Sequence, residues 1–410
     1  MERSELSDFS DIILLNSQKD LSVTFTPNKD IPFFSWYPYV EGFSGSFVNR
    51  IIKRENINSQ NFILDPYAGS GTTSLACTLK GINSLSIEVN PFMCFVARIK
   101  NRIDIFDQYL WNFLEEILEK SKKIKPIIEN PFLKNPRFFP SKNLYQLLQL
   151  KQAILESVLK QEYKDLFLLA LASVIVDVSH MKRCADLRYR RTPNKVLNVS
   201  ARFKKRASKY IFDLMTVKPK NHIFNIINAD IVNLDPNSYA NYLNKIDYVI
   251  TSPPYLNGTN YIRNTKLELA LLDFIKSTLD LVKYHKKLIT AGINSVKKDN
   301  KIKKFEFLKE IMENLTKVAY DKRIPRMVEG YFSDIYKSLV NIDKFLISGA
   351  VGDIVVGDSN FANVHVPTDI FFARICNKIG WDVSQIEIAR ERRSKNGSKL
   401  RESIIKIIKP

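Results

Sequence analysis

Residues 61–73 read NFILDPYAGSGTT, and the fold class of the chain follows from them. Their apolar start predicts a short buried strand, and Pro66 with the two glycines after it predicts a tight turn. Residues 72–80 have the pattern of a helix, which Gly81 ends. A second strand-like run covers residues 84–89. Because a strand, a glycine turn, a helix and a second strand open a doubly wound α/β sheet, we predict this fold class.

The α/β alternation stops after this opening and resumes near residue 222. Residues 101–220 are mostly helical in period and rich in Lys, Arg, Leu and Ile, so we expect a helical insertion without strands there. Residues 1–100 and 221–410 would then form the two parts of one mostly parallel sheet domain, with an antiparallel hairpin at its edge. The later strand-like runs are residues 222–229, 246–250 and 352–357, and the expected hairpin pairs residues 383–388 with 403–408.

The chain carries a large positive charge, and much of it lies in the insertion. Its 62 Lys and Arg residues against 43 Asp and Glu residues give a formal net charge of +19, which attracts polyanions. Residues 177–209 hold eleven of these basic residues against two acidic ones, which is more concentrated than an ordinary solvated helix face. Residues 390–401 form a second basic stretch, which we expect to flank the same groove. The candidate nucleic-acid-binding residues are Lys182, Arg183, Arg188, Arg190, Arg191, Lys204, Lys205 and Arg206.

Cysteine spacing and hydropathy restrict the class of protein further. The four cysteines are widely spaced and form no CxxC pair, so we expect neither a disulfide framework nor a metal site. The longest apolar run, residues 166–176, is too short to cross a bilayer and predicts a buried helix. The first ten residues lack the order of a signal peptide. We therefore expect a soluble, cytoplasmic protein with no membrane partner.

The glycine turn has the features of a ligand-binding loop. Gly69 and Gly71 let the backbone approach a ligand without a Cβ in the way. A dinucleotide-binding fingerprint would need a glycine where this chain has Ser74, and a phosphate-binding P-loop would need a Gly-Lys-Ser/Thr sequence that the turn lacks. Glu88 ends the second strand, where a carboxylate can accept hydrogen bonds from both hydroxyls of a ribose. The loop is therefore a candidate cofactor-binding loop that fits neither the dinucleotide nor the P-loop fingerprint.

A second motif, Thr251-Ser252-Pro253-Pro254-Tyr255, follows the strand-like run 246–250. Two consecutive prolines remove two backbone N–H donors and fix both φ angles, so the loop is rigid and offers carbonyl acceptors. Such a site suits a substrate that arrives as a hydrogen-bond donor, such as the amino group of a base. Ser252 adds a side-chain acceptor, and Tyr255 adds a face on which an extruded base can stack, a contact worth about 1–3 kcal/mol.

Together, the two motifs resemble those of the S-adenosylmethionine-dependent DNA amino-methyltransferase family. The loop is similar to the family's D-P-F-x-G-S-G-T-T signature, with Tyr67 in place of the usual Phe. Ser252 to Tyr255 resemble its Asp/Asn/Ser-Pro-Pro-Tyr/Phe motif, and the Thr-Ser-Pro-Pro-Tyr form is typical of the cytosine-N4 branch. The resemblance covers roughly residues 35–100 and 220–410. It implies a Rossmann-like methyltransferase domain with S-adenosylmethionine as its cofactor.

The resemblance also implies roles for individual residues. The acidic residue and the glycines of the loop would hold the methionine portion of the cofactor, and Asp230 would lie near its adenine amino group. An aromatic segment before the loop would contribute two more contacts. The cofactor-binding residues implied are Phe43, Ser44, Asp65, Tyr67, Gly69, Gly71, Thr72, Thr73, Glu88 and Asp230. The catalytic residues implied are Ser252, Pro253, Pro254 and Tyr255.

The activity implied is site-specific methylation of cytosine N4 in double-stranded DNA, with base flipping and with a cognate restriction endonuclease as a candidate partner. Adenine-N6 methylation uses the same fold, usually with Asp or Asn in place of Ser252. An RNA guanine-N2 methyltransferase carries a related tetrad, and a nonenzymatic DNA-binding subunit is the alternative from another class. Carbon-5 methylation is disfavoured because no cysteine of this chain follows a proline. The insertion departs from the family's commonest layouts, so the segment that reads base edges stays open.

Overall fold

The computed structural model describes residues 7–15, 20–39, 41–184, 187–192, 196–256, 261–296, 302–393 and 397–410. Its centre is an eight-stranded sheet in the order β1-β11-β12-β8-β7-β2-β3-β6. The pairs from β8 through β7, β2 and β3 to β6 are parallel, whereas β12 runs antiparallel to both β8 and β11. The strands are β1 Ile13–Leu15, β2 Phe62–Asp65, β3 Asn83–Ile87, β6 Phe224–Ile227, β7 Ile246–Thr251, β8 Leu346–Gly357, β11 Asp382–Arg393 and β12 Lys399–Ile408.

This sheet confirms the predicted doubly wound, mostly parallel α/β fold. The hairpin of β11 and β12 also forms, but it does not end the sheet. The antiparallel strand β12 lies between β8 and β11, and the three-residue strand β1 pairs in parallel with β11 beyond it. A separate antiparallel pair, β9 Ser359–Phe361 and β10 Val364–Val366, follows β8 directly.

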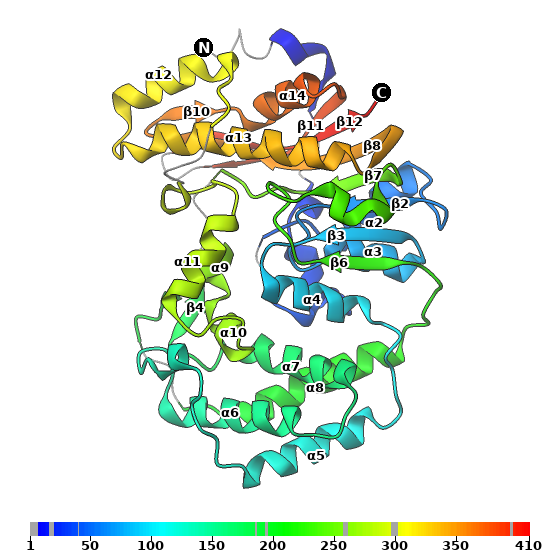
Figure 1. Cartoon of the computed structure of the whole chain (residues 1–410), viewed down its shortest axis with the longest axis vertical. Coiled ribbons are helices and arrows are strands. Elements are labelled where there is room, and N and C mark those ends of the chain that lie inside the picture. The colour runs from blue at the N-terminus through cyan, green and yellow to red at the C-terminus, as the bar shows by residue number, and fades with distance from the viewer. Residues whose placement is uncertain are drawn as a thin grey trace.

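Helices cover both faces of the sheet (Figure 1). Alternate residues of one strand point to opposite faces, and β7 shows this: Tyr248 and Ile250 belong to one hydrophobic core, whereas Val249 belongs to the other. The first core includes residues of α2 Gly45–Arg54, α3 Thr72–Lys80 and α4 Pro91–Asn101. The second includes residues of α12 Lys309–Val318, α13 Arg323–Asp343 and α14 Thr368–Lys378.

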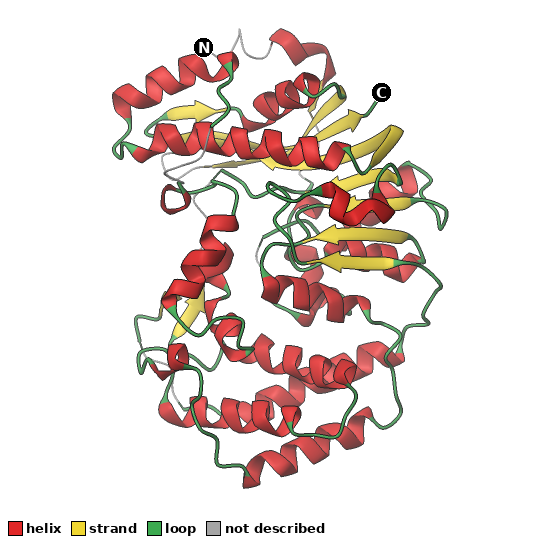
Figure 2. Ribbon diagram, viewed as in Figure 1, coloured by secondary structure: helices red, strands yellow, loops and turns green. Residues whose placement is uncertain are grey.

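The insertion forms a helical unit at one end of the molecule, and the lower part of Figure 2 is almost entirely helical. Residues 166–174 of α7 are all buried, as their apolar run predicts. Contrary to the prediction of an insertion without strands, β4 Met181–Arg183 and β5 Leu187–Tyr189 form a short antiparallel hairpin. Three-residue strands are too short to show an alternating pattern. The helices are α5 Leu110–Lys123, α6 Ser141–Leu155, α7 Gln161–Val174 and α8 Val199–Met215.

Three further helices lie between β7 and α12 along the chain. They are α9 Tyr261–Asn264, α10 Lys266–Leu271 and α11 Thr278–Lys287. In Figure 1, α9 and α11 stand opposite the carboxyl ends of β3 and β6. Among the residues described above, no helix is both long enough and apolar enough to cross a membrane.

Candidate functional site

A cavity of about 460 Å³ lies at the carboxyl ends of the parallel strands. Both the glycine loop and the proline motif reach it, because β2 and β7 are neighbours in the sheet. This is the place where open α/β sheets bind their ligands. The predicted residues that line the cavity are Phe43, Asp65, Tyr67, Gly69, Thr72, Glu88 and Asp230 on the cofactor side, and Ser252, Pro253, Pro254 and Tyr255 on the catalytic side.

The two glycines of the loop have different roles. Both adopt positive φ angles, +51° at Gly69 and +75° at Gly71, so the turn requires them. A Cβ at Gly69 would meet the hydroxyl and ring of Tyr39 at 3.0–3.3 Å, at the wall of the cavity. A Cβ at Gly71 would instead meet the Cβ of Ala97 in α4 at 2.7 Å. Gly71 therefore permits the close packing of the loop on α4 and does not open the approach to a ligand.

Glu88 joins the second strand end to the glycine loop. Its Oε2 accepts the backbone N–H of Gly69 at 2.7 Å, and its Oε1 accepts that of Asn90 at 2.8 Å. Burial raises the pKa of Glu88 to about 7, although these two hydrogen bonds favour the charged form. Each oxygen keeps lone pairs for a further donor, and the side chain lines the cavity. Glu88 is thus placed to accept hydrogen bonds from a bound ligand.

Two other carboxylates border the same cavity. Asp65 accepts the hydroxyl of Thr251 at 2.6 Å and the N–H of Tyr67 at 3.2 Å, and burial raises its pKa to about 6. Asp65 therefore links the glycine loop to the strand that carries the proline motif. Asp230 follows β6 and accepts the N–H of Val232 at 3.0 Å. The carboxylates thus come from the ends of different strands, as the fold predicts.

A buried lysine stabilises the glycine loop through a backbone carbonyl of the loop. Lys100 of α4 is fully buried, and its Nζ donates to the Ser70 carbonyl at 2.9 Å. Burial lowers the pKa of Lys100 to about 7. The carbonyl of Ser70 is thereby fixed between the two glycines. No sequence pattern indicated this contact, since a lysine on a helix is ordinarily exposed.

The proline loop lies along β8 and the residues that follow it. Ser252 Oγ donates to the carbonyl of Val355 at 3.1 Å, and the hydroxyl of Ser359 donates to the carbonyl of Leu256. Between these contacts, the ring of Tyr255 lies against Gly357, where a Cβ would be 2.9 Å from the ring. Positions 355, 357 and 359 share one face of the extended chain. The proline loop is therefore held at three points by one segment.

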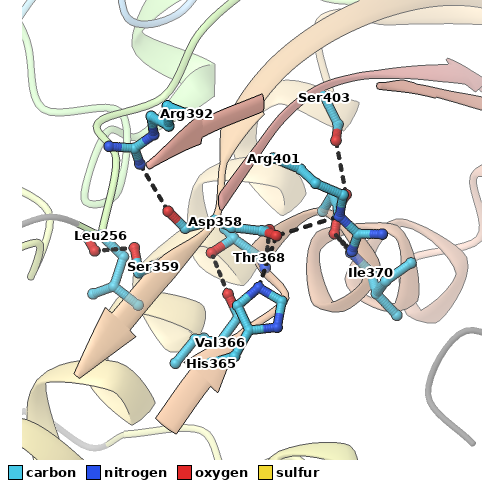
Figure 3. Close-up of polar contacts among 11 residues, drawn as sticks. Leu256, Asp358, Ser359, His365, Val366, Thr368, Ile370, Arg392, Arg401 and Ser403 are labelled. Atoms are coloured by element: carbon cyan, nitrogen blue, oxygen red, sulfur yellow. Dashed lines mark hydrogen bonds and ion pairs between the residues drawn. The ribbon is translucent and has the colours of Figure 1, made fainter. Parts of the chain in front are cut away.

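Asp358 points away from this face and anchors the segment (Figure 3). Its carboxylate accepts hydrogen bonds from His365 Nε2 at 2.9 Å, from the Thr368 N–H at 3.0 Å and from Arg401 Nε at 3.3 Å. Its backbone carbonyl accepts from Arg392 at 2.8 Å. These contacts join the end of β8 to β10, to the start of α14 and to the hairpin of β11 and β12. The support of the proline loop is thus fixed on both sides.

The hairpin also supplies charged residues to the cavity. Gly357, Glu402 and Arg390 are cross-strand neighbours on β8, β12 and β11, and Glu402 forms an ion pair with Arg390. The hydroxyl of Tyr255 interacts with Glu402 and Ser252, and burial raises the pKa of Tyr255. Arg390, Arg392 and Glu402 all line the cavity. The basic stretch 390–401 was expected to flank the DNA-binding groove. No sequence pattern indicated that Glu402 would line the cavity.

Several predicted residues do not reach the cavity. The Ser44 hydroxyl caps α2 by accepting the Phe47 N–H at 3.4 Å, and Thr73 is buried with its hydroxyl donating to the Ile250 carbonyl at 3.2 Å. Gly71 packs on α4 instead. None of the eight basic residues predicted to bind nucleic acid lines the cavity. Tyr39, Tyr261, Arg263 and Lys287 line it without having been predicted.

The basic segment is mostly exposed, with one clear exception. Lys182, Arg188, Arg191, Lys204 and Lys205 are exposed, and Arg190 and Arg206 are half-buried. Arg183 was predicted to bind nucleic acid, and in the structure its side chain is engaged by partners within the protein. Its guanidinium forms an ion pair with the fully buried Glu268 and donates to the Tyr37 hydroxyl at 2.7 Å. A buried carboxylate requires such a partner, and Arg183 supplies it. Lys195 and Asp186 of this segment lie outside the described residues.

Comparisons with known proteins match the sequence resemblance. A model of the DNA methylase family matches residues 39–98. The Type II methyltransferase M.AvaI of Nostoc sp. is 25% identical over 408 residues, which cover 89% of this chain and 82% of the relative. The Type II methyltransferase M.BsoBI of Geobacillus stearothermophilus is 27% identical over 438 residues, covering 92% and 84%. Among solved structures, TrmN from Thermus thermophilus aligns at 9% identity with a TM-score of 0.29, covering 89% of this chain and about half (49%) of that chain.

Proposed function

Since this chain belongs to the S-adenosylmethionine-dependent DNA amino-methyltransferase family, we propose that it methylates the N4 amino group of a cytosine at a specific site in double-stranded DNA. We further propose that it serves a Type II restriction–modification system beside a cognate endonuclease, as the names of its relatives suggest. The observation that supports this most directly is the shared cavity, which brings Ser252 to Tyr255 beside Asp65, Gly69 and Glu88.

The residues on one side of the cavity suit S-adenosylmethionine. Glu88 offers carboxylate lone pairs for the ribose hydroxyls, and Gly69 brings a backbone without a side chain to the wall. Asp65 and Asp230 would border the methionine and adenine ends, in keeping with the family pattern. When bound, the cofactor supplies a methyl group on a positively charged sulfur. Asp65, Gly69, Glu88 and Asp230 are therefore the residues proposed to hold it.

The residues on the other side suit an amino group that attacks this methyl. The hydroxyl hydrogen of Ser252 is directed to the Val355 carbonyl, which leaves an Oγ lone pair to accept a hydrogen bond. The Pro253 carbonyl is a second acceptor, because the proline after it has no N–H to compete. Two acceptors would hold the amino group in place, direct its lone pair towards the methyl and draw on its proton. Tyr255 would stack on the extruded base.

The product identifies the substrate class. Duplex DNA treated with the enzyme and cofactor is digested to nucleosides, which mass spectrometry identifies. We expect N4-methylcytosine. N6-methyladenine as the sole product would contradict the cytosine assignment, and methylation of RNA but not DNA would indicate the guanine-N2 alternative. The matched variant Ser252→Ala should bind cofactor normally and turn over slowly. A wild-type protein that binds cofactor but forms no product on either nucleic acid would support the nonenzymatic alternative.

A further inference from the structure

Helix α11, residues Thr278–Lys287, has one face on the protein and one face exposed. Leu281 and Tyr284 pack against a hydrophobic core, and with Asp280 and His285 they form the half-buried face. The other six side chains lie at the spacing that a helix places on one stripe. The exposed stripe consists of Thr278, Leu279, Val282, Lys283, Lys286 and Lys287.

This helix keeps its conformation with little help from burial. None of its residues is fully buried. Its first turn is instead closed by a capping box, in which the Ser277 hydroxyl accepts the Asp280 N–H at 3.3 Å and the Asp280 carboxylate accepts the Ser277 N–H at 3.0 Å. The helix is therefore a preformed element whose outer side chains face solvent, where a partner can reach them.

The exposed stripe has the composition of a DNA-contacting surface. It carries three lysines and no acidic residue, and Leu279 and Val282, which precede the lysines along the helix, are 71% and 48% exposed. Lysines attract phosphates and bind guanine edges, and apolar side chains contact the methyl group of thymine in the major groove. A stripe that combines both kinds of side chain matches the groups that duplex DNA presents in its major groove.

The stripe leads directly to the cavity. Lys287 at its carboxyl end lines the cavity, as do Leu288 and Ile289 after it. Leu279 lies eight residues earlier, which is about 12 Å along the helix axis at about 1.5 Å per residue. This distance corresponds to roughly three to four base-pair steps of about 3.4 Å. In Figure 1, α11 also stands opposite the carboxyl ends of the parallel strands β3 and β6.

From these observations we infer that the exposed stripe of α11 reads base edges in the major groove next to the extruded base. This inference rests on the proposed function and names the part of the chain that selects the sequence. Val282 and Lys283 lie in the middle of the stripe, and Lys283 stays 76% exposed although its Nζ pairs with Asp280 at 3.4 Å, so both side chains are accessible to DNA. Arg263 of α9, which also lines the cavity, is on the same side of the site.

The test compares two double variants with the same chemistry. Val282→Ser with Lys283→Ser changes the stripe, and Val318→Ser with Lys317→Ser changes an exposed pair on α12, which does not line the cavity. Sequencing that detects methylated bases defines the wild-type site, and kcat/KM is measured on that site and on duplexes with single flanking base pairs changed. For the α11 variant we expect kcat/KM on the wild-type site to fall about tenfold or more, with weaker discrimination at a flanking pair. The α12 control should behave as the wild type.

Calorimetry with S-adenosylmethionine checks that the α11 variant is folded, and its affinity should be unchanged. The single variant Leu279→Ala provides a second probe of the stripe if the double variant fails to fold. An unchanged discrimination profile in these variants would overturn the inference. So would a loss of affinity that is equal for all sequences, because that result assigns only phosphate contacts to α11. A wild-type protein that methylates no DNA would contradict the proposed function itself, which is a separate result.

Discussion

At the scale of a single residue, burial and ligand binding favour opposite ionisation states of Glu88. Burial raises its pKa to about 7, whereas the proposed contact with both ribose hydroxyls needs the ionised carboxylate. Below about pH 7 the empty site holds a proton that cofactor binding must displace. We therefore expect the affinity for S-adenosylmethionine to fall as the pH falls through about 7, by up to about tenfold per pH unit, and to level off above this range.

Calorimetry between about pH 5.5 and 8.5 measures this dependence, and buffers of different ionisation enthalpy report the released proton. The variant Glu88→Gln is the control, since it keeps the shape of the side chain and cannot titrate. It should bind more weakly at high pH and show little change with pH. A wild-type affinity that stays constant across this range would show that Glu88 is already ionised in the empty site.

Individual site residues could be predicted where the pattern that indicates them lies within a short stretch of sequence. Asp65, Glu88 and Ser252 each lie at the end of a strand, so the sequence places them at one edge of the sheet. Arg183 could not be assigned in this way. Its partners Glu268 and Tyr37 are 85 and 146 residues distant along the chain, and only the folded structure shows that this arginine of the basic run pairs with a buried carboxylate.

At the scale of elements, Tyr255 depends on the row formed by Gly357, Glu402 and Arg390. Glu402→Gln keeps the shape of the side chain but removes its charge and weakens the pair with Arg390. We expect kcat/KM on DNA to fall about tenfold, since a displaced tyrosine loses base stacking worth about 1–3 kcal/mol. Cofactor affinity should remain unchanged, because Glu402 acts here as a positioning residue for Tyr255.

A fluorescent base analogue at the target position measures extrusion directly and should report less unstacked base in Glu402→Gln. Glu391→Gln is the matched control, because Glu391 is on the same hairpin and pairs with Lys399 at the surface, 3.1 Å away. Gly357→Ala should act in the same direction as Glu402→Gln, since its Cβ would press on the ring of Tyr255. Normal extrusion in both site variants would remove this role from the row.

The helices and strands could be predicted where a neighbouring stretch of sequence determines where each one begins or ends. The glycine turn determines the start of α3, which spans residues 72–80 as the sequence predicts. The hairpin of β4 and β5 is too short for a pattern, and nothing in residues 399–408 indicates that β12 enters between two earlier strands. Strand order depends on contacts between distant segments, which hydrophobic period does not encode.

At the scale of the whole molecule, the net charge of +19 should appear as salt-dependent DNA binding. Lys182, Arg188 and Arg191 are exposed, whereas Arg190 is committed to the Met181 carbonyl at 3.0 Å. Replacing the three exposed residues with glutamine should weaken binding to any duplex. It should also reduce the slope of log affinity against log salt by about 0.9 for each phosphate that the protein no longer neutralises.

The control replaces Lys317, Lys322 and Lys344, which are exposed residues that do not line the cavity. Titration of a duplex at several salt concentrations should separate the two triple variants. If both change the slope equally, the attraction comes from total charge alone, and residues 177–209 have no special contact with DNA.

The position of β12 has a consequence for the order in which the protein is made. Its neighbours β8 and β11 are both synthesised earlier, and so is β1, which pairs with β11. None of these strands can complete the sheet until residues 399–408 have left the ribosome. A chain stopped before Lys399 would hold two sheet fragments with open edges, and such species tend to aggregate. Chains that stop before Lys399 should therefore be insoluble and inactive.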